Sequence, residues 1–342
     1  MSLRFLTGFD YYNISQITRV WSYASGGQMF TPGRFYGQAY GYVWQSGYVS
    51  TSLPAATTYI LGVALYMDQA DPTNPIIVFQ DATTSPTSPI TQVDVRMTSA
   101  GACQFTRNGT VIATSAPFFY FGQYNYLEFK ISIDSTNGYI QLRSSGEVIL
   151  NTTSLNTQYT GNNYVNMVRL QAFADHTFSS SFTQKFDDVY ILDTAGSVNN
   201  GFLGESRVQT QYPVANGDVN NFLPVGATQN YQCVDETISD DDLTYVKAAV
   251  VSDIDDYQMG TVSLTGTIYA VQINVTHRKD DVGSRTISPI IKSGGTYYTG
   301  NMFTCQSSYI VSQAIWELEP HTALAWSNST VSAVNACLKI TG

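Results

Sequence analysis

Charged residues are scarce in this sequence. They make up 12% of its 342 residues, about half of the ~25% that is usual for soluble domains. The 16 basic residues are scattered rather than clustered, and against 26 acidic residues they leave a formal net charge of -10. A surface that binds nucleic acid needs a concentrated basic footprint. The sequence therefore predicts no nucleic-acid partner.

Long apolar runs are also lacking. No stretch approaches the ~20 apolar residues that a membrane-spanning helix requires, and the opening MSLRFLTGFDYYN has no apolar core of the kind found in signal peptides. We expect synthesis in the cytosol and no membrane insertion.

Cysteine is rare, and its spacing is wide. No CxxC pair occurs, which argues against a zinc ribbon or a redox motif. We expect buried free thiols, and a disulfide between two of the last three cysteines is the alternative under oxidising conditions. The four cysteines are Cys103, Cys233, Cys305 and Cys337.

Helical periodicity is almost absent, whereas alternation with a period of two recurs along the chain. In residues 126–134, Leu127, Phe129 and Ile131 fall on one face of a predicted strand and the polar residues fall on the other. Asn137-Gly138 is a strong hairpin signal, and Ser145-Gly146 marks a second turn. These signals predict a meander of three antiparallel strands.

Further predicted strands are short and separated by Gly, Pro, Asn and Ser, as is typical of β-sandwiches. They cover residues 39–50, 59–67, 76–81, 92–97, 103–107 and 167–173 in the first half. The second half has predicted strands at residues 262–264, 268–276, 284–292 and 336–340, and a short helix near 330–335.

The run over residues 186–213 is the predicted junction of two domains. A β-prone segment stops at a loop of Asp, Gly, Ser and Asn, and a new strand is predicted to begin at Gly204. We expect an all-β protein with one β-sandwich over residues 1–200 and a smaller one over residues 201–342.

Several motifs carry a resemblance to a known family. In the first half they are Gly8-Phe9-Asp10, GRFYGQA at residues 33–39 and FDDVYILD at residues 186–193. In the second half they are FLGESRV at 202–208, NYQCVDE at 230–236, DDDLTYV at 240–246, and the tail with Trp316, Pro320, Trp326 and residues 330–338. Together they resemble a family of tailed-bacteriophage virion proteins whose first domain is a laminin-G or concanavalin-like jelly roll.

The resemblance implies a non-enzymatic structural protein of the virion, assembled in the cytoplasm of the bacterial host. Its implied partners are other virion proteins and copies of itself. Two positions stay open, with the tail favoured: the tail, as a fibre, baseplate or minor tail protein, and the capsid exterior, as a decoration protein. The alternative function is a lectin of the virion that attaches to host surface glycans.

The carboxylates give little support for an enzyme. A glycoside hydrolase needs two carboxyl groups about 5 to 9 Å apart, and the first domain lacks the Glu-x-Asp-x-x-Glu grouping typical of concanavalin-like glucanases. The nearest substitute is Glu317 and Glu319 beside Trp316, which we interpret as a solvated strand face. The remaining glutamates are Glu128, Glu147, Glu205 and Glu236. We therefore predict no catalytic residues and no enzymatic activity.

Metal and cofactor sites are not predicted either. His176, His277 and His321 are isolated in sequence and form no nucleophile motif. The acidic runs could supply oxygen ligands to calcium, but Asp is equally typical of turns. These runs are Asp240-Asp241-Asp242, the group Asp253, Asp255 and Asp256, and Asp187-Asp188, for which turn or edge hydrogen bonding is expected.

Aromatic residues are concentrated in two segments, residues 36–48 and 118–126. Core packing accounts for most of such residues in a sandwich. If one segment is exposed, it could form a sugar-stacking platform or an assembly surface. For the lectin alternative, Tyr36 and Tyr42 are the predicted stacking residues.

Overall fold

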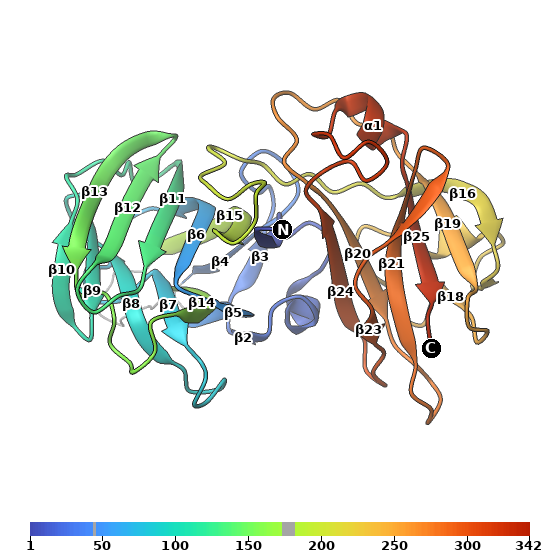
Figure 1. Cartoon of the computed structure of the whole chain (residues 1–342), viewed down its shortest axis with the longest axis horizontal. Coiled ribbons are helices and arrows are strands. Elements are labelled where there is room, and N and C mark those ends of the chain that lie inside the picture. Colours follow the sequence, from blue (N-terminus) through green and yellow to red (C-terminus); the bar gives the residue numbers. More distant parts are fainter. Residues whose placement is uncertain (44–45, 173–181) are drawn as a thin grey trace. The chain divides into compact units, whose positions relative to one another are not determined.

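The chain is almost entirely β. The computed structural model describes residues 1–43, 46–172 and 182–342, and they divide into two compact units, Met1–Val208 and Gln209–Gly342 (Figure 1). The prediction of an all-β fold with two domains is confirmed. The predicted boundary at residue 200 falls within the first unit. Within the described residues no helix is long and apolar enough to cross a membrane.

The first unit is a sandwich of two antiparallel sheets. The sheet that we call the front sheet has the order β13 (Glu147–Leu155), β12 (Gly138–Ser144), β11 (Tyr124–Ser132), β6 (Thr58–Met67), β15 (Thr183–Asp193), β4 (Ala39–Val43) and β3 (Gln28–Phe30), and β1 (Leu3–Thr7) also pairs with β15. The back sheet has the order β10 (Thr110–Thr114), β9 (Cys103–Arg107), β8 (Ile90–Met97), β7 (Ile77–Asp81), β14 (Val165–Ala172), β5 (Gly47–Ala56) and β2 (Tyr23–Ser25). A 3₁₀ helix covers Ile14–Arg19.

The core lies between these two sheets. Leu127, Phe129 and Ile131 of β11 are buried in it, as the alternation predicted, together with Leu61 and Val63 of β6. Successive side chains of a strand point to opposite faces. The other set of side chains on β11, β6 and β15 therefore lies on the outer face of the front sheet, and this face positions the candidate site.

The predicted meander is confirmed as β11, β12 and β13. Ser145 and Gly146 both have positive φ, 46° and 87°, as a two-residue hairpin turn between twisted strands requires. The first turn is wider than the Asn-Gly signal implied. Asp134 Oδ1 accepts hydrogen bonds from the backbone N–H groups of Thr136 (2.8 Å) and Asn137 (2.7 Å), so this aspartate closes the turn.

The other predicted strands of the first half correspond to β4 and β5, β6, β7, β8, β9 and β14. Two of the predictions extend onto positions outside the described residues, namely 44–45 within 39–50 and 173 at the end of 167–173.

The strand predicted to begin at Gly204 is wrong. The next strand, β16, begins at Pro213, and the preceding backbone bonds to side chains of the front sheet instead of a neighbouring strand. Leu203 N–H donates to the hydroxyl of Tyr190 (3.2 Å) and Gly204 N–H donates to Glu128 Oε1 (2.8 Å). We call residues 202–208 the strap.

The second unit is built on one main sheet. Its order is β16 (Pro213–Asn220), β19 (Ile254–Met259), β25 (Asn335–Ile340), β21 (Thr286–Ser293) and β22 (Thr296–Thr299), and β23 (Phe303–Thr304) also pairs with β21. Two further pairs are β17 (Leu223–Val225) with β18 (Tyr245–Lys247) and β20 (Val271–His277) with β24 (Ile310–Trp316). The helices are a 3₁₀ turn at Asn230–Cys233 and α1 (Asn328–Ser332).

Strands β20, β21 and β25 and helix α1 match predicted elements, but the strand predicted at residues 262–264 is wrong. The N–H groups of Val262 and Leu264 donate to the side chains of Ser332 (3.3 Å) and Asn328 (3.0 Å). This segment is therefore fixed by the α1 region and not by a sheet.

All four cysteines are buried free thiols, as predicted. Burial raises the pKa of the Cys103 and Cys337 thiols well above the ordinary value, which keeps them protonated and unreactive.

Candidate functional site

A row of aromatic and cationic side chains crosses the outer face of the front sheet. The strand register places Tyr124 of β11 opposite Tyr66 of β6, Tyr66 opposite Lys185 of β15, and Lys185 opposite Gly41 of β4. A Cβ at Gly41 would lie 2.1 Å from the carbonyl oxygen of Gln184 and 3.0 Å from the ring of Phe30. The bare glycine thus leaves room for Phe30 of β3. We call Phe30, Lys185, Tyr66 and Tyr124 the aromatic row.

Its members are in mutual contact. Lys185 Nζ lies 4.8 Å from the ring centroid of Phe30 and 5.0 Å from that of Tyr66. The rings of Tyr66 and Tyr124 are 5.6 Å apart and tilted by 59°. The row runs from Tyr124 on β11 to the ring of Phe30, which lies beside Gly41 on β4. Because β11 and β4 are three strand spacings apart, the row is roughly 14 Å long. All four side chains are half-buried, so each has one part in the sheet surface and one part facing outward.

The row has polar groups that the described part of the chain does not satisfy. The Lys185 side chain makes no hydrogen bond or ion pair with a described residue, and its ammonium lies against the two aromatic rings. The Tyr124 hydroxyl is buried and has no hydrogen-bond partner among those residues. The buried Tyr124 hydroxyl is a cost within the protein, whereas the Lys185 ammonium keeps hydrogen-bond donors that a ligand with polar groups could use.

A bulge in β15 places two acids beside the row. The register with β6 shifts between Asp187 and Tyr190, and Asp188 has φ of 49°. Asp187 accepts hydrogen bonds from the N–H groups of Arg34 (2.7 Å) and Asp188 (2.8 Å). Burial, followed by the charge of Asp188, raises the pKa of Asp187. Its two oxygens are occupied by the backbone.

The neighbouring charges fasten the strap. Arg34 donates to Asp188 Oδ2 (3.3 Å), to the carbonyl of Ser206 (3.3 Å) and to Glu205. Asp188 Oδ1 also accepts from Val208 N–H (2.8 Å). Glu128 accepts from Tyr190 as well as from the strap. Asp188 and Glu128 therefore bind the strap to the front sheet beside the aromatic row.

The predicted stacking residues are placed differently. Tyr42 is wholly buried and its hydroxyl bonds to that of Tyr40 at 2.6 Å, so its predicted exposure is wrong. Tyr36 is 49% exposed, but the guanidinium of Arg207 lies 3.8 Å from its ring centroid. Of the aromatic row, only Tyr124 falls in a segment that the sequence singled out.

Glu317 and Glu319 do not form a solvated strand face. Both are buried, with Glu319 only 1% exposed. Burial alone would raise the pKa of Glu319, but hydrogen bonds from Ser293, Thr322 and the backbone N–H of His321 outweigh it and lower the pKa to about 2. Glu319 therefore organises a turn after β24.

His277 and His321 have different partners. His277 is buried, its Nε2 is 2.8 Å from the hydroxyl of Ser312, and burial lowers its pKa to about 4. His321 Nδ1 is 3.1 Å from the hydroxyl of Tyr298. His176 lies outside the described residues.

The acidic runs of the second unit are also engaged with the protein. Asp242 pairs with Arg278 at 2.7 Å. Asp255 and Asp256 lie in the middle of β19, fully buried, and Asp256 contacts Lys292 Nζ at 3.2 Å. In the described ranges no three His, Cys, Asp or Glu side chains converge as metal ligands would.

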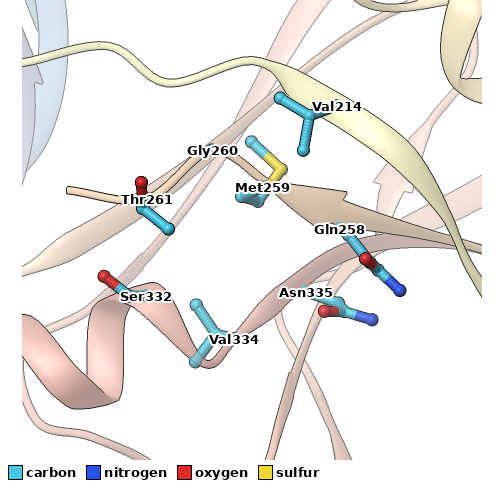
Figure 2. A pocket seen from close by; sticks show the side chains of 8 residues that line it. All are labelled: Val214, Gln258, Met259, Gly260, Thr261, Ser332, Val334 and Asn335. Atoms are coloured by element: carbon cyan, nitrogen blue, oxygen red, sulfur yellow. The ribbon is translucent and has the colours of Figure 1, made fainter.

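A hollow of about 560 Å³ opens in the second unit where β19 ends (Figure 2). Val214 and Met259 lie on one side of it and Val334 on the other, and its polar members are Gln258, Thr261, Ser332 and Asn335. Its lining is neutral and contains no charged side chain.

Comparison with known proteins gives fold-level likeness. No family model and no curated protein matches the sequence. The alginate lyase Aly36B, in complex with alginate tetrasaccharide, is similar at 12% identity and a TM-score of 0.39, over 56% of this chain and 96% of the lyase. The carbohydrate-binding module CBM66 from Bacillus subtilis follows at 8% identity and 0.33, over 50% and 94%. Trypanosoma rangeli sialidase is similar at 7% identity and 0.34, over 49% of this chain and 27% of the sialidase.

These neighbours correct the predicted function. They are two carbohydrate-active enzymes and a carbohydrate-binding module, and none of the three is a virion protein. The prediction of a non-enzymatic structural protein of the virion is contradicted by this finding, as is the prediction that the chain is not an enzyme. The family resemblance and the location in a virion stay predictions.

Proposed function

We propose that the chain is a glycan-binding protein and that the aromatic row on the front sheet is its binding surface. The observation that carries this proposal is the unbroken row itself, with Lys185 between the rings of Phe30 and Tyr66. Aromatic rings offer an apolar face to the C–H faces of a sugar, while tyrosine hydroxyls provide a polar edge.

The position of the row supports this function over a purely structural one. Core packing uses the opposite face of the same strands, where Leu65 and Leu127 are fully buried. The row therefore adds nothing to the sandwich core, yet it groups three aromatic side chains. A linear surface of roughly 14 Å suits several consecutive sugar units of a polysaccharide better than one monosaccharide.

The strap and its acids give the surface rigidity. Arg34, Asp188 and Glu128 tie the strap to strands β15 and β11, which also carry Lys185 and Tyr124. A ligand that meets a preformed surface loses less free energy to ordering. Attachment to host glycans from a virion is the finer prediction for this surface.

The test is affinity electrophoresis of the full chain through gels that contain single polysaccharides, neutral and acidic. The wild type should be retarded by at least one of them. Tyr66→Ala should weaken that interaction about fivefold or more, because one stacking contact contributes about 1 kcal/mol beyond its buried area. The matched control is Tyr159→Ala, which removes a tyrosine that is 47% exposed and lies outside the row.

Two results would refute the proposal. One is a wild type that no polysaccharide of the panel retards. The other is a Tyr66→Ala variant that is retarded as strongly as the wild type and the Tyr159→Ala control.

A further inference from the structure

We infer that the ligand of the aromatic row is an acidic glycan whose sugars carry carboxylates, and that Lys185 is the residue that selects for its charge. This inference rests on the proposed function and names the class of glycan. It starts from the balance of charges on the outer face of the front sheet.

The acids of that face are already engaged. Asp187 accepts from two backbone N–H groups, and Asp188 is bound by Arg34 and by the strap. Glu128 accepts from Tyr190 and from Gly204 N–H. Backbone dipoles and one arginine thus offset these negative charges within the protein.

The cations of the same face are not engaged in this way. Lys185 contacts Phe30 and Tyr66, Lys130 lies 5.8 Å from the ring centroid of Tyr139, and Arg143 lies 4.2 Å from that of Phe202. No ion pair joins any of the three to a described residue. The described outer face therefore presents three cations backed by aromatic rings and without carboxylate partners.

An aromatic ring stabilises a cation through its negative face but accepts its N–H donors poorly. Lys185 is half-buried, and its ammonium has three such donors. A carboxylate supplies charge-assisted hydrogen bonds, which are about twice as strong as neutral ones. A neutral sugar can stack on the row without forming them.

The overall charge of the chain makes the local cations decisive. At a formal net charge of -10, the protein as a whole repels a polyanion at long range. An acidic glycan can bind only where that field is reversed locally. Lys185 provides such a reversal at the centre of the aromatic row.

The experiment compares acidic polysaccharides with neutral forms of the same polymer. Alginate and polygalacturonate are each used as the free acid and after chemical reduction of the carboxylates to alcohols, so that linkage is retained and charge is removed. Binding to the full chain is measured by titration calorimetry at low salt. The variants are Lys185→Gln, Tyr66→Ala and, as the matched control for charge, Lys247→Gln, which changes an exposed lysine of the second unit.

At least one acidic polymer should bind the wild type about tenfold more tightly than its reduced form. Lys185→Gln should remove most of this preference, with an unchanged melting temperature, and Lys247→Gln should retain it. Tyr66→Ala should weaken the binding of both forms, because stacking does not depend on the charge of the sugar.

Three results would overturn the inference. Equal affinity for the acidic polysaccharide and its reduced form would still support glycan binding but would contradict a preference for carboxylates. A preference that survives Lys185→Gln would assign it to another residue. If dextran sulfate binds as tightly as the tighter-binding of alginate and polygalacturonate, and uncharged dextran does not bind, the surface attracts any polyanion. If the wild type binds none of these polymers or any neutral one, the proposed function itself fails.

Discussion

Replacing Arg34 by methionine should destabilise the first unit far more than an ordinary ion-pair deletion. The Arg34 side chain is 8% exposed and that of Asp188 is 4% exposed. The guanidinium also lies 5.0 Å from the ring centroid of Tyr126. Removing one partner of a buried pair costs about 3–5 kcal/mol because the other charge stays buried. Val208 N–H still donates to Asp188, so we expect about 3 kcal/mol.

Hydrogen exchange followed by mass spectrometry is the suitable assay, because it reports opening free energies for the amides of β11 and β15 separately from those of the second unit. The control is Arg278→Met. It breaks the pair with Asp242, whose side chains are 30% and 62% exposed, and exposed pairs contribute only about 0.2–1 kcal/mol.

A double mutant separates charge from packing. Burial raises the pKa of Asp188 and Arg34 lowers it, so Arg34→Met should raise that pKa further. Adding Asp188→Asn should then recover much of the lost stability, because no unpaired charge remains. The reasoning is refuted if Arg34→Met costs no more than Arg278→Met. If Asp188→Asn recovers nothing, the loss comes from packing on Tyr126.

Three further predictions concern stability. Burial raises the pKa of Asp10 from 3.8 to about 6, so the folded state binds more protons than the unfolded state between about pH 4 and 6. The first unit should therefore lose stability as pH rises through that window. Melting curves of Asp10→Asn should show a weaker dependence of the melting temperature on pH. Gly62→Ala would place a Cβ 2.0 Å from the ring of Tyr190, and urea unfolding should show a loss of about 1–3 kcal/mol; no loss would mean that the ring moves freely. Glu319→Ala leaves the donors of its turn, among them Thr322, without an acceptor. This should destabilise the second unit by about 1–3 kcal/mol, seen as a lower melting temperature. The proposed glycan binding by the first unit should not change.

Much of the fold could be predicted because strand alternation is a local property. The burial of Leu127 and Phe129 and the outward position of Glu128 follow from a period of two within a single strand. The Ser145-Gly146 turn likewise depends on two adjacent residues that can adopt positive φ. Such features need no knowledge of what the strand pairs with.

The candidate site could not be predicted in the same way, because it depends on register between distant strands. Lys185 meets Tyr66 only because β15 pairs with β6, and Phe30 reaches the row only because Gly41 carries no side chain. Neither β6 nor β15 has a sequence motif that predicts that the two strands pair. Tyr66 was within a predicted strand, but its face and its neighbours were not determined by the sequence.

The errors have a common physical cause. At Gly204 and at Val262 the composition suggested strands, and in both places side chains distant in sequence take the backbone hydrogen bonds instead. Glu319 was expected on a solvated face, yet Ser293 and the following turn bury it with its hydrogen bonds satisfied. Alternation cannot reveal partners of this kind.

The strap also determines how the molecule bears mechanical load. Only residues 209–212 separate its end at Val208 from β16, so tension on the second unit reaches the strap almost directly. The bonds of Val208 to Asp188 and of Gly204 to Glu128 then break one after another, from the strap's end inward. The strap is therefore expected to open under tension before the paired strands of the front sheet separate, and the rigidity that it gives to the aromatic row would be lost at that point.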